Sequence, residues 1–218
     1  MPRSLLQTIV LLVGLACGLV TSACATVYQD FAFYDESELP GRPFPGYVQH
    51  DVYGVYFYPT LPVSPIFTIE RIRFWHHEDN DVPDPFSVFI VVRNTSAQHI
   101  YALDILEGFT TTCTDCWEEV EIEESYWDTS TPGWSYGVMI QPLGGGFTTA
   151  EPRIYMDDAV SAGGINMVAS YNDYYGFYNI SYLEELFGGG DFFMEIIVRY
   201  DETVATAKSS LSTIKALY

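Results

Sequence analysis

Short runs of aromatic and β-branched residues recur along most of the chain, and clusters of proline and glycine separate them. In the run 134–140, Trp, Tyr, Val and Ile alternate with Ser, Gly and Met. A period of two is typical of β-strands, because successive side chains point to opposite faces of a sheet. The pattern predicts strands over 53–58, 67–75, 86–92, 100–106, 117–122, 134–141, 154–156, 166–171 and 192–200.

Many short strands with this punctuation are typical of two antiparallel sheets packed face to face. The chain is 48% hydrophobic and 16% aromatic, which excludes the disordered, collagen-like and coiled-coil classes. We therefore predict an all-β fold, an antiparallel β-sandwich or jelly roll, as a single domain over 26–202. The runs 86–92 and 192–198 are largely apolar on both faces, which predicts a central place for each in its sheet.

The first 25 residues have the pattern of a secretory signal peptide. They carry one charge and an apolar run over 5–20, which small residues follow. The run is shorter than the ~20 apolar residues of a membrane-spanning helix, so no membrane span is expected. The expected location is secreted, extracellular or at the cell surface. Lipidation of Cys24 is the alternative, but Thr21 stands where a lipoprotein signal has leucine.

The segment 203–218 forms a separate C-terminal tail. It holds both lysines of the chain and no acidic residue. Its apolar residues, among them Val204, Leu211 and Ile214, recur at steps of three and four, which predicts a short amphipathic helix. Such a helix needs a surface to dock on, either the sandwich or a partner.

The charge of the chain limits its partners. Asp and Glu number 29 against 9 Lys and Arg, a formal net charge of −20. Nucleic-acid binding needs a basic face that releases counterions, and the few cations here are scattered. Nucleic acid is therefore excluded as a partner, and anionic membrane surfaces are disfavoured for the same reason.

The segment Gly133-Trp-Ser-Tyr-Gly137 matches the nucleophile elbow of α/β-hydrolases. In those enzymes the serine lies on a turn between a strand and a helix, and a histidine follows later in the chain. Here Ser135 lies inside a predicted strand, and the last histidine is His99. We therefore interpret the motif as accidental and expect a protein without enzymatic activity.

Cys113 and Cys116 are the only cysteines after the predicted signal peptide. In an oxidising compartment an even count predicts a disulfide, here one that pins a turn. Two alternatives use the same residues. The cysteines with His76 and His77 have the composition of a Cys₂His₂ zinc site, and a C-x-x-C pair also occurs in redox proteins.

An acidic turn concentrates oxygen ligands at Glu78, Asp79, Asp81 and Asp84. Hard oxygen donors at this density are what Ca²⁺ binds, although the EF-hand pattern is absent. The alternative is a plain solvated turn. No other cofactor is expected.

Aromatic residues gather in the run 171–178, where rings stand beside an amide and a carboxylate. Aromatic rings stack on apolar sugar faces while polar groups bind the hydroxyls, so this run is the candidate glycan-binding site. The alternative is ordinary packing of the rings. The candidate residues are Tyr171, Asn172, Asp173, Tyr174 and Tyr175.

Over about 26–200 the chain resembles secreted bacterial β-sandwich modules, of the jelly-roll carbohydrate-binding or pre-peptidase C-terminal kind. The runs that carry the resemblance are FTIERIRFW, DPFSVFIVV, SYGVMIQPLGGG, PRIYMDDA and DFFMEIIVRY. The resemblance implies a non-catalytic binding, adhesion or spacer role, and it transfers no binding residue.

These observations together predict a secreted, non-enzymatic β-sandwich that binds protein or polysaccharide at the cell surface or in the extracellular matrix. One alternative is a carbohydrate-binding module. The other is a self-associating subunit of an extracellular assembly, joined by strand or tail exchange.

Overall fold

The computed structural model describes residues 26–44, 51–57, 66–77, 83–94, 99–127, 134–146, 149–158, 166–174 and 176–201. Residues Val27–Tyr200 form one compact unit. The predicted signal peptide over 1–25 and the predicted helix over 203–218 lie outside the described residues.

Strands dominate the described residues, so the predicted all-β fold is confirmed. The strands are β1 (Thr26–Ala32), β2 (Arg42–Pro43), β3 (Asp51–Phe57), β4 (Ile66–His77), β5 (Pro85–Asn94), β6 (His99–Thr110), β7 (Cys116–Trp127), β8 (Trp134–Pro142), β9 (Gly144–Gly146), β10 (Thr149–Glu151), β11 (Arg153–Met156), β12 (Asn166–Asn172), β13 (Gly176–Tyr182) and β14 (Met194–Asp201). A short 3-10 helix, η1, spans Glu36–Glu38, and a short α-helix, α2, spans Leu183–Phe187. No helix within the described ranges has the length and apolar character needed to cross a membrane.

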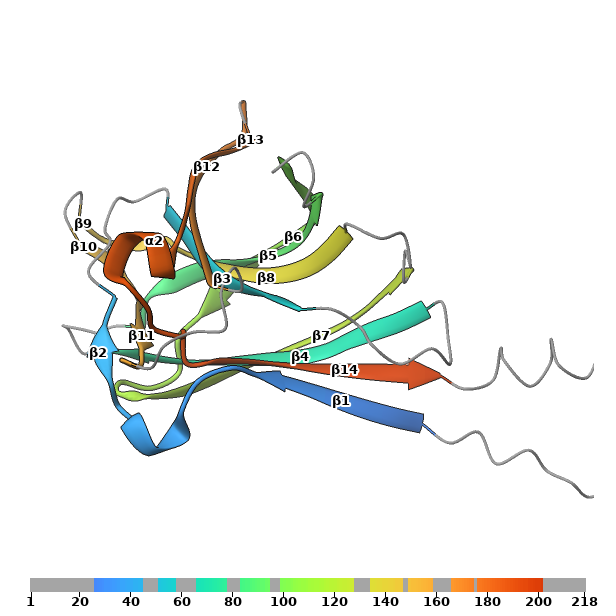
Figure 1. The fold of residues 1–218 in the computed structure, drawn as a ribbon, viewed down its shortest axis with the longest axis horizontal. Helices are drawn as coiled ribbons and strands as arrows, with labels where there is room; N and C mark the ends of the chain where they lie inside the picture. The colour runs from blue at the N-terminus through green and yellow to red at the C-terminus, as the bar shows by residue number, and fades with distance from the viewer. Residues whose placement is uncertain are drawn as a thin grey trace, which may run out of the picture. The chain divides into compact units, whose positions relative to one another are not determined.

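Two antiparallel sheets form a sandwich (Figure 1). Sheet I has the order β1-β14-β4-β11-β2, and β7 pairs with the edge of β4 that faces away from β14. Sheet II has the order β13-β12-β3-β8-β5-β6, and β9 and β10 form a separate two-stranded ladder. Strands β5 and β14 each have a neighbour on both sides, as their apolar character on both faces predicted.

The inner faces of the two sheets meet in a central core of aromatic and branched side chains. Phe67 of sheet I packs edge-on against Tyr136 of sheet II, with ring centroids 4.8 Å apart. Phe74 of sheet I packs against Phe86 of sheet II at 5.2 Å. Edge-to-face ring pairs of this kind stabilise a core beyond the area that they bury.

Sheet II also buries side chains on its outer face. This outer cluster consists of Val52, Tyr56, Phe89, Val91, Met139, Met167 and Ala169. The sheet curls over these residues, so that its two edge strands, β13 and β6, come into contact (Figure 1). This explains why β5 is apolar on both faces: one face packs into the central core and the other into the outer cluster.

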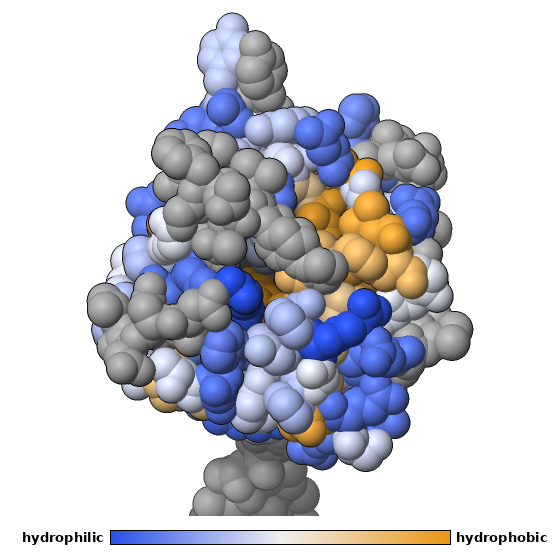
Figure 2. All heavy atoms as spheres, turned by 90° about the vertical axis from the view of Figure 1, so that its left-hand side faces the viewer, coloured by the Kyte–Doolittle hydropathy of each residue, from blue (hydrophilic) through white to orange (hydrophobic). Residues whose placement is uncertain are grey.

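Helix α2 closes one end of the sandwich, on the face shown in Figure 2. Leu183 is fully buried, and the ring of Phe187 packs edge-on against Phe44 at 5.5 Å. The guanidinium of Arg42 lies 5.8 Å from the centre of the Phe187 ring. Leu186 remains exposed, so apolar and charged side chains stand side by side on this face.

A buried polar network ties three connections together. The carboxylate of Asp157 is fully buried and accepts hydrogen bonds from the backbone N–H groups of Asp35 at 2.8 Å and Asp191 at 2.7 Å. The Asp191 carboxylate accepts a hydrogen bond from the side chain of Asn166, whose oxygen accepts one from the backbone N–H of Phe192. Buried carboxylates are tolerated when hydrogen-bond donors surround them, and this one joins chain segments far apart in sequence.

Candidate functional site

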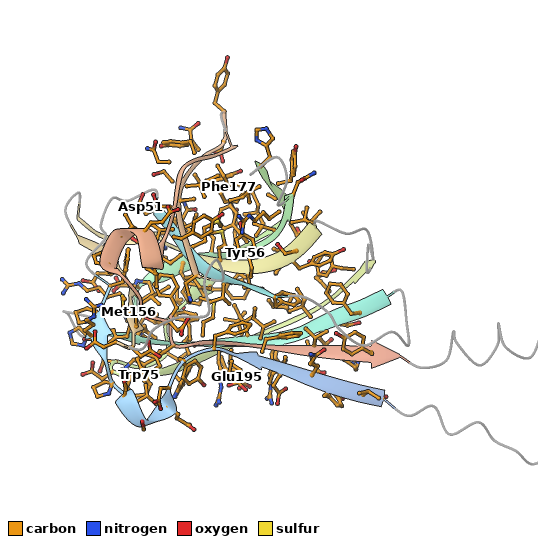
Figure 3. All side chains as sticks on the ribbon, viewed as in Figure 1. Asp51, Tyr56, Trp75, Met156, Phe177 and Glu195 are labelled. Carbon is orange, nitrogen blue, oxygen red and sulfur yellow. A yellow bond between two sulfur atoms is a disulfide. The ribbon has the colours of Figure 1, made fainter. Side chains whose placement is uncertain are left out.

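Three places in the structure bring together side chains that could bind a ligand or a metal. They are the turn between β12 and β13, a charged cavity on the outer face of sheet I, and a group that we call the cysteine corner. The cysteine corner consists of Cys113, Cys116, His76 and Glu118. Figure 3 shows the side chains on the ribbon, with Phe177 near the β12–β13 hairpin and Glu195 on sheet I.

The hairpin formed by β12 and β13 divides the predicted glycan site. Tyr171 packs into the outer cluster, with its ring 4.7 Å from Phe89 and 5.1 Å from Phe177. Asn172, Asp173 and Tyr174 form the exposed turn. Tyr174 is 84% exposed, and its backbone N–H donates a 2.8 Å hydrogen bond to the Asn172 side chain. Tyr175 lies outside the described residues.

The electrostatics of Tyr171 show what surrounds its hydroxyl. Burial raises the pKa of Tyr171, and the carboxylates of Asp173 and Glu107 raise it further. Asp173 also shares a hydrogen bond with this hydroxyl. Glu107 belongs to the edge strand β6 and Asp173 to the turn after β12, so the curl of sheet II brings acidic groups from two separate segments to one tyrosine. Tyr171 therefore anchors the hairpin, whereas the ring of Tyr174 is the most exposed one among its described residues.

Arg93 of β5 holds the other end of the outer cluster. Its guanidinium lies 5.3 Å from the centre of the Tyr56 ring and 4.9 Å from that of Tyr182. Cation–π contacts of this geometry contribute about 0.5–1 kcal/mol each at exposed sites and more when they are desolvated. The arginine therefore links β5 to β3 and to the base of the β12–β13 hairpin.

A charged cavity of about 530 Å³ lies on the outer face of sheet I. Its arginines already have carboxylate partners: Arg71 Nη1 lies 3.2 Å from Glu119 Oε1, and Arg73 Nε pairs with Glu195 Oε2. The residues that line it are Tyr28, Asp30, Glu70, Arg71, Arg73, Glu119, Glu195 and Ile197. Such a lining suits a ligand or peptide with charges of both signs.

The sequence interpretation missed this cavity. The available indication was the alternation of Arg71 and Arg73 on one strand and of Glu119 and Glu121 on another. The structure pairs Arg71 with Glu121 and Arg73 with Glu119 across β4 and β7. Opposite charges facing each other across antiparallel strands are favourable, so the pattern also predicts the pairing of these strands.

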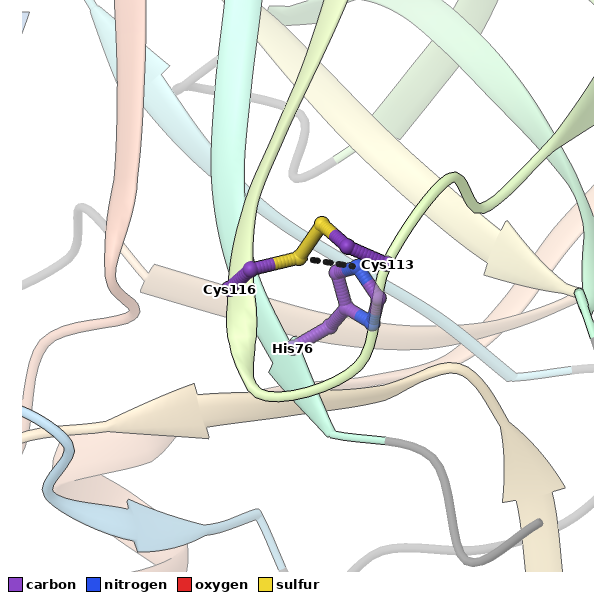
Figure 4. Close-up of side chains that lie close together, drawn as sticks. All are labelled: His76, Cys113 and Cys116. Atoms are coloured by element: carbon purple, nitrogen blue, oxygen red, sulfur yellow. Dashed lines mark hydrogen bonds between the residues drawn. A yellow bond between two sulfur atoms is a disulfide. The ribbon is translucent and has the colours of Figure 1, made fainter. Parts of the chain in front are cut away.

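Cys113 and Cys116 are joined by a disulfide at the connection between β6 and β7, with their Cα atoms 6.2 Å apart (Figure 4). The side chain of His76, from β4, points at this bridge from below. It is fully buried, and its Nε2 lies 3.7 Å from Cys116 Sγ and 3.6 Å from Glu118 Oε2. Glu118 is itself buried and accepts a 2.7 Å hydrogen bond from the backbone N–H of Thr112.

The predicted Cys₂His₂ set is not assembled. His77 is partly exposed, and its Nδ1 contacts the carboxylate of Asp115. Among the described residues, the group whose ligand atoms lie close enough to hold a metal is His76 with the two cysteines, and these atoms are within 4.8 Å of one another. Adjacent residues of a strand face opposite sides, so the fold admits only one of the two histidines.

Burial, together with the smaller effect of the neighbouring His77, lowers the pKa of His76 from its ordinary value of 6.5 to about 4. The imidazole is therefore neutral in the folded protein at neutral pH. The unfolded chain takes up a proton below about pH 6.5, whereas the folded chain resists protonation down to about pH 4. The stability that the neutral imidazole contributes is thus complete above pH 6.5 and is lost as the pH falls.

We expect the free energy of unfolding to fall by about 3 kcal/mol between pH 7 and pH 4 on account of this histidine alone. Urea unfolding across this range, with His76→Gln as the comparison, measures the effect. The variant lacks the titrating group, so its stability should depend less steeply on pH. Parallel pH profiles for the two proteins would show that His76 is not held neutral.

Of the predicted calcium ligands, only Asp84 belongs to the described residues. It is buried, its backbone N–H donates to Thr111 Oγ1 at 2.9 Å, and its backbone oxygen accepts from Thr111 N–H at 3.0 Å. Its side chain packs against Gly144, where an added Cβ would collide with it. Glu78, Asp79 and Asp81 lie outside the described residues. Asp84 thus has a structural role at the end of sheet II where β5 begins.

Ser135 is fully buried inside β8 and pairs in register with Arg93 of β5. The strand continues past it to Pro142, without the turn into a helix that a nucleophile elbow requires. Gly133 lies outside the described residues. The surroundings of Ser135 are those of a core strand residue.

Comparison with known proteins gives no match of this chain to a family model, to a curated protein or to a solved structure.

Proposed function

We propose that the chain is a secreted, non-enzymatic binding module that contacts protein or polysaccharide at the cell surface or in the extracellular matrix. The contact surface is the turn between β12 and β13. The observation that carries this proposal is the exposure of Tyr174, which is 84%, on a hairpin whose base is firmly packed.

A tyrosine in this position suits recognition. Its ring offers a large apolar surface and its hydroxyl a hydrogen-bond donor, and few rotatable bonds are lost on binding. The contacts of Tyr171 with Phe89 and Phe177 hold the strands below it. The Asn172 side chain holds the turn through the backbone of Tyr174. A preorganised turn lowers the entropic cost of binding.

A carbohydrate-binding module is the second candidate within this proposal. Tyr174 stands beside Asn172 and Asp173, both exposed, so an aromatic ring and polar oxygens share one turn. A ring that stacks on a sugar face and neighbours that bind hydroxyls would serve a polysaccharide better than a flat protein surface.

We expect Tyr174→Ala to weaken binding to the cognate surface material at least tenfold, about 1.4 kcal/mol, with no change in thermal stability. Glycan arrays, polysaccharide pull-downs and binding to isolated envelope material measure the effect. Tyr28→Ala is the matched control, because Tyr28 is 55% exposed and lines the cavity on sheet I.

The pair of variants separates the two surfaces. If Tyr28→Ala abolishes binding and Tyr174→Ala does not, the cavity on sheet I is the contact surface and the assignment to the hairpin is wrong. If the wild-type protein and both tyrosine variants all elute as larger species in size-exclusion chromatography, the result would instead favour an assembly subunit. Such a subunit would be joined through an edge strand such as β13 or β6.

A further inference from the structure

We propose that reduction of the Cys113–Cys116 disulfide opens a zinc site, whose four ligands are the two cysteine sulfurs, Nε2 of His76 and a carboxylate oxygen of Glu118. This inference is independent of the hairpin and of its partner. It rests on the arrangement of four side chains from two neighbouring strands, β4 and β7, and the connection before β7.

The spacing of the ligand atoms carries the argument. Zinc binds sulfur at about 2.3 Å and imidazole nitrogen or carboxylate oxygen at about 2.0–2.1 Å, so tetrahedral ligands lie about 3.6 Å apart for nitrogen and sulfur and about 3.4 Å apart for nitrogen and oxygen. His76 Nε2 lies 3.7 Å from Cys116 Sγ and 3.6 Å from Glu118 Oε2. Two edges of a tetrahedron, both of which meet at His76, are thus already present. The two sulfurs and His76 Nε2 lie within 4.8 Å of one another, whereas the Glu118 carboxylate does not belong to this close group and must turn toward the sulfurs to complete the set.

The remaining change is the separation of the two sulfurs, which must reach about 3.8 Å in a tetrahedral zinc site. Breaking the bond between them permits this separation. Cys113 is exposed at the connection between β6 and β7, so it moves without disturbing the core, whereas Cys116 begins β7 and is held by its pairing with β4.

The chemistry balances with a dithiol reductant. Two electrons and two protons from the dithiol convert the disulfide into two thiols, and the dithiol becomes a disulfide. Zinc binding then releases both thiol protons, because only thiolates bind the metal. Glu118 Oε2, which accepts hydrogen bonds from the backbone N–H and the hydroxyl of Thr112, gives up part of this bonding when it binds the metal.

Zinc is the metal that this donor set favours. Two thiolates with one imidazole select a borderline soft ion, and a closed tetrahedral set is typical of structural zinc sites. In an oxidising compartment the disulfide holds the loop and the site is closed. Under reduction, zinc takes over the same task and ties the loop to β4 through His76. The corner is therefore a redox-controlled metal site.

Cobalt replaces zinc as a spectroscopic probe. The full-length protein is reduced with a phosphine, freed of reductant without air, and titrated with Co²⁺. We expect one equivalent to bind, with thiolate-to-cobalt charge-transfer bands and the intense d–d bands of tetrahedral cobalt, and Zn²⁺ to displace it. The oxidised protein should show neither band. Equal cobalt spectra before and after reduction, or none after reduction, would overturn the proposal.

Three variants locate the ligands, and a fourth serves as the control. Cys113→Ser and His76→Gln should each weaken cobalt binding by about a hundredfold, and Glu118→Gln by about tenfold or more. Thr114→Ala, in the same exposed loop, is the control and should bind as the wild type does. His76 is buried, so His76→Gln could fail to fold. In that case Glu118→Gln and the exposed Cys113→Ser still test the proposal. Unchanged affinity in Cys113→Ser or Glu118→Gln contradicts the assigned ligand set.

Discussion

Replacement of Asp157 by alanine is expected to lower the free energy of unfolding by about 4 kcal/mol. The carboxylate is fully buried and accepts hydrogen bonds from the backbone N–H groups of Asp35 and Asp191. Its removal leaves the buried N–H of Asp191 without this acceptor, a loss that costs about 1–3 kcal/mol, and it also breaks the part-buried hydrogen bond from the N–H of Asp35. It also uncouples the segment before η1 from the one before β14. Urea unfolding at neutral pH measures the change.

Asp158→Ala is the matched control for this prediction. Asp158 is the next residue, but its side chain is exposed and forms an ion pair with Arg42 at the surface. Exposed pairs contribute about 0–1 kcal/mol, so the control should unfold almost as the wild type does. Similar unfolding midpoints for the two variants would mean that the buried network does not hold the connections together.

Replacement of Gly54 by alanine is expected to cost about 3 kcal/mol or more. Gly54 lies in β3 opposite Met139 of β8. A Cβ at this position would lie 2.6 Å from the Cα of Met139 and still closer to the backbone oxygen of Val138. Strand β3 cannot move away, because β12 pairs with its other edge. The substitution therefore forces the central strands of sheet II apart.

Gly108→Ala provides the control for backbone strain. Gly108 has a positive φ of 89°, but an added Cβ would meet nothing within 4 Å. Its cost is limited to the left-handed conformation, about 1–2 kcal/mol. The unfolding midpoints of both variants, with the denaturant slope compared to the wild type, distinguish the two causes. Equal destabilisation would refute a steric role for Gly54.

Much of the strand content was predictable from the sequence. Each of the nine predicted runs overlaps a strand of the structure, because alternation with a period of two is a local property. The apolar character of 86–92 on both faces also indicated that β5 is covered on both sides, and the outer cluster supplies the second cover.

Strand β13 was not predicted. The sequence predicts a strand that ends at 171 and a ring-rich candidate glycan site over 171–178, whereas the structure divides this run into the end of β12, a turn and the start of β13. Asn172, Asp173 and Gly176 are strong turn formers, and they obscured the strands on either side. The role of each ring follows from the curl of sheet II, which places Tyr171 in the outer cluster and leaves Tyr174 exposed.

The charged cavity and the cysteine corner depend on one irregularity in β4. Phe67 and Ile69 point into the central core, but after the bulge at Glu70 the inward residues are Ile72 and Phe74. A bulge adds one residue to a strand and reverses which face each later side chain occupies. The odd-numbered Arg71 and Arg73 therefore line the outer cavity.

The sequence by itself determined the strands, the turns between them and the two cysteines that lie three residues apart, because these depend on neighbouring residues. Only the tertiary structure decided which of the two histidines, His76 or His77, lies beside the Cys113–Cys116 disulfide. Uninterrupted alternation from Phe67 would place His77 inside, and the bulge places His76 there instead. A bulge arises from pairing with distant strands, here β7 and β14, so no local pattern contains it.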